Sequence, residues 1–486
     1  MAQNKPGKED KVQFQELSIT SWKDQKGVDI SQGLIELKYY ESILSNHITA
    51  TMVIGETGNT VDKGKRKVSL VDGLPVRGGE PVRIKCKDPK GNILKFVDDT
   101  AFYVNTVRDG INETQRSIHS FDLCTKEFLA NEQSRVVKRY SGKISESVKK
   151  ILKDVLKTKN YKARDIEETA NSYNFIGNIK KPFYSLTWLA AKGIPSDGAY
   201  GATAGFLFFQ TKDGFQFKSL ETLVGPTQGG GSADKKSAKA YEYTNSEKKS
   251  AGGMEKIVKY NVNQNINVQE KLTVGAYNTR FLFFNPFTFE VGHSDFDVSK
   301  DQDGKVKPAG KGALSYIAED FRTGTTRGIS AVLDVGTLPS GKDGKEQLKR
   351  WKDKPEETND KVQDRMVQSI SRYNQVFSVS VDIMIQADFS LKAGDTIYCS
   401  YTEPGSDKPN PQTEGLYVIA SVCHKITASE SYSTMNLIRD SFTLKPTPPS
   451  DPPSSEPEKP VGMMRALTGV ADAVTFNKFD FDKRGR

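Results

Sequence analysis

The chain of 486 residues has little cysteine, and what it has is widely spread. No two cysteines have the Cys-x-x-Cys spacing of a zinc site, and four in so long a chain are too few for a disulfide framework. We therefore expect free, buried thiols in a reducing compartment and no metal site. The four are Cys86, Cys124, Cys399 and Cys423.

Long apolar runs are missing as well. The longest, 281–284 and 376–385, are far shorter than the roughly 20 residues that a helix needs to cross a bilayer. The N-terminus, MAQNKPGKEDK, has no apolar segment of the kind that a secretion signal needs. We therefore expect no membrane insertion and a protein that matures in a cytoplasm.

Sequence motifs of enzymes are not found. There is no Gly-x-Ser-x-Gly elbow and no phosphate-binding Gly-x-x-x-x-Gly-Lys loop. The acidic stretch 165–168 is typical of a solvated face and not of a catalytic carboxylate group. A calcium loop that began at Ser299 would have serine at its first ligand position and Gly310 in place of the bidentate glutamate, so 299–304 is interpreted as a polar turn. We therefore predict no enzyme, no catalytic residue and no cofactor. The histidines lack metal-ligand spacing, and we expect structural roles for His47, His119, His293 and His424.

The net charge of +9 does not by itself indicate a nucleic-acid partner. The 70 Lys and Arg residues are scattered among 61 Asp and Glu residues instead of clustering with aromatics. A solvated surface explains this pattern better than phosphate binding does. The one basic knot, KGKRK at 63–67, is typical of an exposed loop.

What the sequence has is alternation of apolar and polar residues. Residues 12–124 carry short alternating runs separated by turn residues, which predicts antiparallel strands. A chain of this length predicts about three folding units. The clearest strands of the first unit begin at Leu34, Ile48, Pro81 and Thr100.

The pattern then changes to helical spacing. Apolar residues three and four apart predict a helix over 145–157, and a second helix is expected over 182–192. Two apolar runs flank Asp213-Gly214, which is a strong signal for a β-hairpin. This hairpin spans 206–220, and part of it is apolar on both faces.

The rest of the chain alternates between low-complexity and strand-like segments. Residues 225–253 are rich in Gly, Ser, Lys and Ala, which predicts a loop. Alternation returns over 257–274, a charged helix is expected over 342–373, and a last β block is expected over 376–444. Seven prolines within 446–460 then end the β block.

The order of these segments resembles the central baseplate hub protein of contractile-tailed, T-even-like phages, which is related to the N-terminal part of type VI secretion spike proteins. Each segment alone is a generic pattern, and their shared order is the specific feature. The segments are LIELKYYES at 34–42, ITATMVI at 48–54, the helix at 144–156, FIGNIKKPFYSLTWLA at 175–190, the hairpin at 205–220, LKAGDTI at 391–397, GLYVIASVCHKI at 415–426 and YSTMNLIRD at 432–440.

This resemblance implies a fold that is mainly β with α+β insertions, containing two tube-like antiparallel β-barrel domains plus helical insertion domains. The expected parts are a first barrel over 10–125, a helical insertion with the hairpin over 126–224, a flexible Gly/Lys-rich loop over 225–253, second-barrel strands with a helical insertion over 254–375, completion of that barrel over 376–445, and a Pro-rich C-terminal arm over 446–486.

The resemblance also implies a structural function in the virion. A homotrimer would form a ring in the tail baseplate, assembled in the host cytoplasm, and would match the six-fold tail tube to the three-fold central spike. Implied partners are the spike protein, tail-tube or tube-initiator proteins and baseplate wedge proteins, with DNA only passing through the lumen. Because DNA must pass without being held, few Lys or Arg side chains are expected on the inner wall.

Two sets of aromatic residues are candidates for contacts between subunits. The first set, on the hairpin, is a candidate subunit interface, although a core strand explains it equally well. The second set is a candidate C-terminal strap, with an untethered tail as the alternative. The sets are Phe206, Phe208, Phe215 and Phe217, and Phe476, Phe479 and Phe481.

Two alternatives from other classes remain open. A hub-associated cell-wall hydrolase is one, although no α-rich domain with paired carboxylates in a cleft is indicated. A DNA-binding protein of the virion is the other, supported only by the lysines of 63–67 and 235–249.

Overall fold

In a computed structural model of the chain, the described residues are 11–440 with gaps at 22–26, 59–60, 64–65, 75, 114–115, 198–202, 226–237, 244–253, 265–267, 287–288, 298–324, 335–342, 347–348, 350–358, 360–361, 403–409 and 411–412. The predicted strap residues Phe476, Phe479 and Phe481 and the arm 446–486 lie outside this part of the chain. No described helix is long and apolar enough to cross a membrane.

The first β module is a curved antiparallel sheet in the order β2-β1-β7-β9-β10-β4-β3, with β8 paired to β7. Alternate residues of its strands point into one core, as Ala50, Met52 and Ile54 of β4 do. The strands are β1 (Gln13–Thr20), β2 (Gly27–Asp29), β3 (Leu34–Ser42), β4 (Thr49–Glu56), β7 (Pro81–Lys87), β8 (Ile93–Phe96), β9 (Phe102–Glu113) and β10 (Arg116–Thr125), with the small hairpin β5 (Val61–Lys63) and β6 (Arg66–Val68) and the helix α1 (Leu70–Gly73) beside them.

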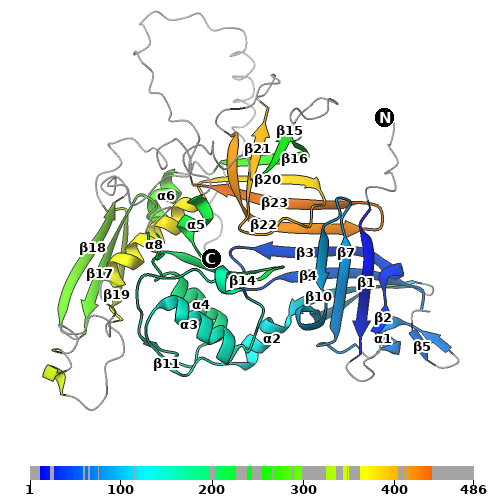
Figure 1. Cartoon of the computed structure of the whole chain (residues 1–486), viewed down its shortest axis with the longest axis horizontal. Coiled ribbons are helices and arrows are strands. Elements are labelled where there is room, and N and C mark those ends of the chain that lie inside the picture. The colour runs from blue at the N-terminus through cyan, green and yellow to red at the C-terminus, as the bar shows by residue number, and fades with distance from the viewer. Residues whose placement is uncertain are drawn as a thin grey trace, which may run out of the picture. The chain divides into compact units, whose positions relative to one another are not determined.

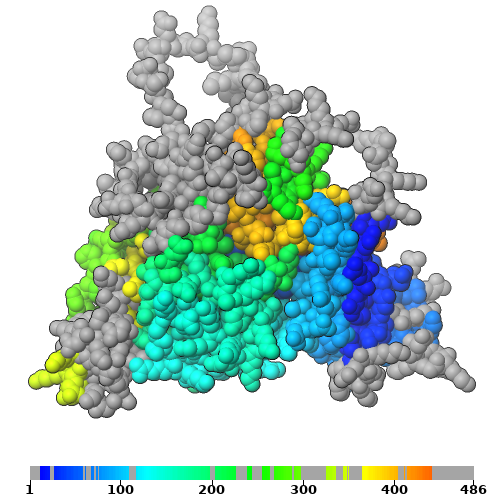
Figure 2. Space-filling model, in the orientation of Figure 1, coloured from blue at the N-terminus to red at the C-terminus, as the bar shows by residue number. Residues whose placement is uncertain are grey.

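A helical insertion follows, with a core of its own. The predicted helices are confirmed: α3 continues as a π-helical turn over Ile151–Val155, and α4 begins at Pro182. The predicted hairpin is confirmed as β13 and β14. The elements are α2 (Lys126–Gln133), β11 (Arg139–Tyr140), α3 (Ile144–Lys150), β12 (Phe175–Ile176), α4 (Pro182–Ala190), β13 (Phe206–Thr211), β14 (Gly214–Ser219) and α5 (Leu220–Val224). In the space-filling view the part of this insertion drawn in cyan forms one continuous surface (Figure 2).

The second β module is a closed six-stranded barrel. Its strands pair around the ring in the order β22-β21-β15-β16-β20-β23, and β23 pairs back with β22. Its interior is filled by one apolar cluster that includes Val381, Ile383, Tyr417 and Leu437. The strands are β15 (Lys239–Tyr243), β16 (Glu255–Gln264), β20 (Val379–Gln386), β21 (Thr396–Tyr401), β22 (Gly415–Thr427) and β23 (Ser431–Arg439).

A second insertion lies between β16 and β20. A three-stranded sheet in the order β18-β17-β19 packs one face on helix α8, where Phe281, Phe296 and Val367 are buried together. Its elements are α6 (Val268–Val274), β17 (Asn278–Asn285), β18 (Glu290–Asp297), β19 (Arg327–Val332) and α8 (Val362–Val376).

The structure confirms a mainly β fold with helical insertions and corrects two segments. Within 225–253, predicted as loop, Lys239–Tyr243 form β15, because Tyr241 packs into the barrel core and parallel pairing with β21 satisfies the backbone. Within 257–274, predicted to alternate throughout, strand β16 ends at Gln264 and α6 begins at Val268. Among the described strands only the second β module closes by hydrogen bonds, since the first sheet ends at β2.

Candidate functional site at the junction of the two β modules

Strand β22 belongs to both β modules. One of its edges pairs with β23, and the other pairs first with β21 through residues 415–418 and then with β3 through residues 421–427. In Figure 1 the strands β22 and β23 (orange) lie beside β3 and β4 (blue). A continuous hydrogen-bonded sheet therefore joins the two modules.

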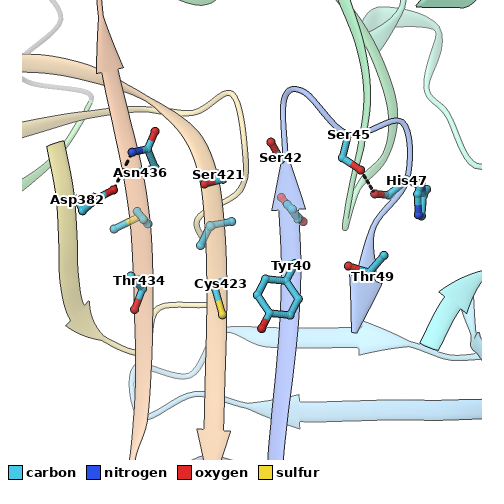
Figure 3. Close-up of a pocket in the computed structure, with 13 residues that line it drawn as sticks. Tyr40, Ser42, Ser45, His47, Thr49, Asp382, Ser421, Cys423, Thr434 and Asn436 are labelled. Carbon is cyan, nitrogen blue, oxygen red and sulfur yellow. Dashed lines mark hydrogen bonds between the residues drawn. The ribbon is translucent and has the colours of Figure 1, made fainter. Parts of the chain in front are cut away.

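The outward side of this joined sheet is polar. Figure 3 shows side chains of β20, β23, β22 and β3 pointing the same way, with Cys423 beside Tyr40 and Asn436 beside Asp382. The Asn436 amide donates to Oδ1 of Asp382 at 2.7 Å, and the residues around it line a hollow of about 330 Å³. We define the junction face as a set of residues that lie across from one another on β20, β23, β22, β3, β4 and β10, together with Arg108 of β9. They are Asp382, Met384, Gln386, Tyr432, Thr434, Asn436, Ser421, Cys423, Lys425, Glu36, Lys38, Tyr40, Ser42, Thr49, Thr51, Val53, Ser120, Asp122 and Arg108.

The charges of the junction face balance. Its three acidic residues, Glu36, Asp122 and Asp382, are matched by Lys38, Lys425 and Arg108. Glu36 accepts from both lysines, at 2.8 Å each, and Arg108 Nη2 lies 2.7 Å from Asp122 Oδ2. Hydrogen bonds from Lys38 and Lys425 lower the pKa of Glu36. The face therefore carries its cations in ion pairs.

Beneath this face, Glu41 links three parts of the chain. It lies on β3, its Oε1 accepts from the Lys212 amide at 2.6 Å, and its Oε2 accepts from the Ala393 amide at 2.8 Å. The Tyr39 hydroxyl also donates to Oε1. Burial raises the pKa of Glu41 to about 7, although these donors oppose the shift. One carboxyl thus holds the hairpin of the insertion and the β20–β21 loop against the first module.

Asp388, in the same β20–β21 loop, is a second buried carboxylate. Lys239 Nζ lies 2.6 Å and Lys90 Nζ 3.1 Å from its Oδ2, and Asn92 donates to Oδ1 at 3.2 Å. Burial opposes its ionisation, but the hydrogen bonds from Lys239 and Ser390 outweigh this and hold the pKa of Asp388 well below its usual value. Since Lys90 and Asn92 belong to the first module, this carboxylate also spans the junction.

His424 is fully buried at the junction. It lies on β22, its Nδ1 is 2.8 Å from the Ser433 hydroxyl, and its ring stacks on Tyr39 at 5.9 Å between centroids. Burial lowers the pKa of His424 to about 3, so the ring is neutral. Its role in packing agrees with the structural role expected for the histidines.

Arg372 of α8 fixes the insertions to the end of the barrel. The guanidinium bonds Oε1 of Glu221 on α5 at 2.8 Å and Oδ2 of Asp440 after β23 at 2.9 Å. All three side chains are about 1% exposed or less. Burial alone would lower the pKa of Arg372, but the two carboxylates raise it. Three segments far apart in sequence are therefore joined at one point.

The structure places the four predicted interface phenylalanines inside the chain. Phe206, Phe208, Phe215 and Phe217 are 0–3% exposed, and they pack with Leu186 and other apolar residues of the helical insertion. The other face of the hairpin, with Leu207 and Phe209, packs in a second cluster. Their burial therefore needs no neighbouring subunit, and a contact with one stays a prediction.

Other chemistry does not gather at this site. Among the described residues, no group of three or more His, Cys, Asp or Glu side chains could hold a metal ion. The four cysteines are free, and only Cys423, on the junction face, is not fully buried. Burial raises the pKa of Cys86 and of Cys399 to about 12.

Sequence reasoning missed Glu36, Glu41 and Asp388. The run LIELKYYES predicted the strand that carries Glu36 and Lys38. It gave no sign of Lys425, which lies near the other end of the chain. A buried carboxylate on the apolar side of β3, such as Glu41, was the one local anomaly that could have marked the junction.

Several solved structures are similar to this chain. The 43 kDa tail protein of prophage MuSo2 from Shewanella oneidensis is 10% identical, with a TM-score of 0.46, over 88% of this chain and 98% of that one. A tail protein from Neisseria meningitidis MC58 is 8% identical, with a TM-score of 0.44, over 90% and 100%. The E. coli protein c3393, a type VI secretion component, is 9% identical, with a TM-score of 0.38, over 88% and 76%.

Two of these structures are named as phage tail proteins and the third as a type VI secretion component, which are the kinds of protein that the sequence resembles. No family model matches the chain, and no curated protein matches it in sequence. Because every TM-score given above is below 0.5, the function proposed below rests on the geometry of the chain itself.

Proposed function

We propose that the chain is a structural baseplate hub subunit of a contractile phage tail, and that it acts by forming a trimeric ring. The observation that carries the proposal is strand β22, which pairs with both β21 and β3 and so makes one stiff wall from two β modules. A trimer of such chains presents six β modules around one axis. That number matches a six-fold tail tube on one side and a three-fold spike on the other.

The two modules are suited to this role in different ways. The closed barrel hides its strand edges, which prevents uncontrolled pairing with other chains. The first sheet ends at β2, a strand of three residues, so the described sheet has a short edge at which a neighbouring copy can continue it. In this proposal the first sheet becomes tube-like when the ring forms.

The junction face is the surface proposed to line the channel. It is broad, it carries mostly hydroxyl, amide and thiol groups, and its cations are in ion pairs. Nonspecific DNA binding depends on neutralising phosphates with Lys and Arg, so such a wall lets DNA pass. The proposed partners are the central spike, tail-tube or tube-initiator proteins and wedge proteins, and no catalytic role is proposed.

Electron microscopy of the purified assembly tests this function. End-on views are expected to show a three-fold ring with an axial channel, and the reconstruction is expected to place Tyr40 and Thr434 on the channel wall. A ring whose channel is lined by the helical insertion instead would contradict the assignment of the junction face. A particle without any axial channel would contradict the hub function itself.

A further inference from the structure

Two lysines face each other across the seam between the β modules. Lys425 of β22 lies directly opposite Lys38 of β3 in the antiparallel register. Like charges in directly opposite positions destabilise a sheet, so this pair needs a compensating group. Their side chains are 46% and 32% exposed, so both ammonium groups are within reach of a large anion.

Glu36 is that compensating group. Its Oε2 lies 2.8 Å from Lys38 Nζ and its Oε1 lies 2.8 Å from Lys425 Nζ, so one carboxylate is shared by both cations. Both lysines lower the pKa of Glu36, which keeps it ionised at neutral pH. The third cation of the junction face, Arg108, has Asp122 in the same way.

We propose that Glu36 is a specificity-determining residue that prevents the seam from binding the phosphate backbone of a nucleic acid. By pairing with Lys38 and Lys425 within the chain, it lowers the charge of this two-lysine site from +2 to +1 and occupies both ammonium groups. The inference rests on the proposed function, in which the junction face lines the channel for DNA. The charge chemistry itself acts in any oligomeric state.

The test compares binding of a fluorescent DNA duplex by the full chain and by Glu36→Gln over a range of salt concentrations. Loss of the carboxylate frees two cations, so the slope of log K against log salt is expected to steepen by about 1.8, at about 0.9 per phosphate contact. The ratio of the affinity of Glu36→Gln to that of the unmodified chain should accordingly fall roughly twelvefold between 50 and 200 mM salt.

The matched control is Asp295→Asn. Asp295 accepts a bidentate pair from Arg280 on the three-stranded sheet, at 2.7 and 2.8 Å, away from the junction face. This variant changes the net charge by the same amount but frees only one cation, so the slope of log K against log salt is expected to steepen by at most about 0.9. Equal binding by Glu36→Gln and Asp295→Asn would overturn the proposal, because charge alone would then explain any gain.

Two further variants keep the test decisive if Glu36→Gln folds poorly. In the otherwise unmodified chain, Lys38→Gln with Lys425→Gln is expected to leave the slope of log K against log salt unchanged, since both lysines are already occupied and contact no phosphate. A shallower slope there would overturn the proposal. Adding both substitutions to Glu36→Gln should abolish the gain.

Failure of this inference and failure of the hub function are separable. DNA binding is measured per chain, whereas the ring is detected by mass. If the chain forms a trimer but Glu36→Gln binds DNA no better than the unmodified chain, this inference fails and the hub function stands. If the chain stays a monomer but Glu36→Gln binds DNA more tightly, the hub function fails and the role of Glu36 in masking the lysines stands.

Discussion

The backbone amide of Lys212 donates a hydrogen bond to Oε1 of Glu41 at 2.6 Å, which ties the hairpin of the helical insertion to strand β3 at the junction of the two β modules. The same carboxyl accepts from Ala393 in the β20–β21 loop. A single buried group thus connects three parts of the chain.

Glu41 makes stability depend on pH. Its folded pKa, about 7, lies above the ordinary value of 4.5, so the protonated form is favoured in the folded chain. The stabilisation is complete below pH 4.5 and is lost as pH rises through 7, by about 3 kcal/mol in total. Glu41→Gln is expected to remove this loss, measured by urea unfolding from pH 5 to 8.

The control for Glu41 is Glu146→Gln, which removes an exposed carboxylate paired with Lys149. It should leave the pH profile as it is in the unmodified chain. His424 contributes the opposite trend below pH 6.5, since its neutral form is favoured, but it contributes equally to both variants. A profile of Glu41→Gln parallel to that of the unmodified chain would refute the role assigned to Glu41.

Asp388→Asn is expected to loosen the junction from the barrel side. The change leaves Lys239 and Lys90 without their shared carboxylate, and removing one partner of a largely buried pair costs about 3 kcal/mol. Because the folded pKa of Asp388 is depressed, its contribution is present at neutral pH and is lost as pH falls below its ordinary range. Urea unfolding at pH 7 and pH 5 should give the same loss, because Asp388 is ionised in the folded chain at both values, and the absence of a loss at pH 7 would argue against the ion pair.

Phe208→Ala separates a core role from an interface role for the hairpin. Phe208 stacks on Phe215 with ring centroids 5.4 Å apart inside the insertion, so truncation should destabilise the single chain by about 3–5 kcal/mol. Thermal unfolding at low protein concentration measures this. If the stability of the single chain were unchanged while the ring dissociated, the phenylalanines would be subunit-interface residues, which is the other role predicted for them from the sequence.

Thiol labelling tests the burial of the cysteines. One thiol per native chain, Cys423 on the junction face, is expected to react with a maleimide, and all four should react in denaturant. Cys86 and Cys399 are buried, and burial raises both of their pKa values to about 12, so neither thiolate forms at neutral pH. Mass spectrometry of labelled peptides identifies the site, and rapid native labelling of Cys399 would show that the barrel opens.

Local patterns were enough to predict much of the fold. Asp213-Gly214 marked the hairpin, and Gly214 adopts a φ of +112° with the position of an added Cβ 2.5 Å from the Asn160 carbonyl oxygen, so glycine is required there. Alternation in 48–54 identified β4 correctly. These elements depend on neighbours in sequence, which is why sequence patterns reveal them.

The junction could not be predicted in the same way, because its contacts join distant segments. Tyr241 lies in a segment whose composition predicts loop, yet it is fully buried because β21 and β16 flank its strand. Glu36 meets Lys425 only because β3 pairs with β22. Register between distant strands is set by the whole fold, and no single segment carries that information.

The mass of the purified chain in solution, alone and mixed with the spike protein, tests the central claim most directly. The hub account predicts a species of three copies of the 53.9 kDa chain, alone or on adding the spike, that stays intact on dilution to working concentrations. A chain that remains a single copy at every concentration, with and without the spike, would contradict it.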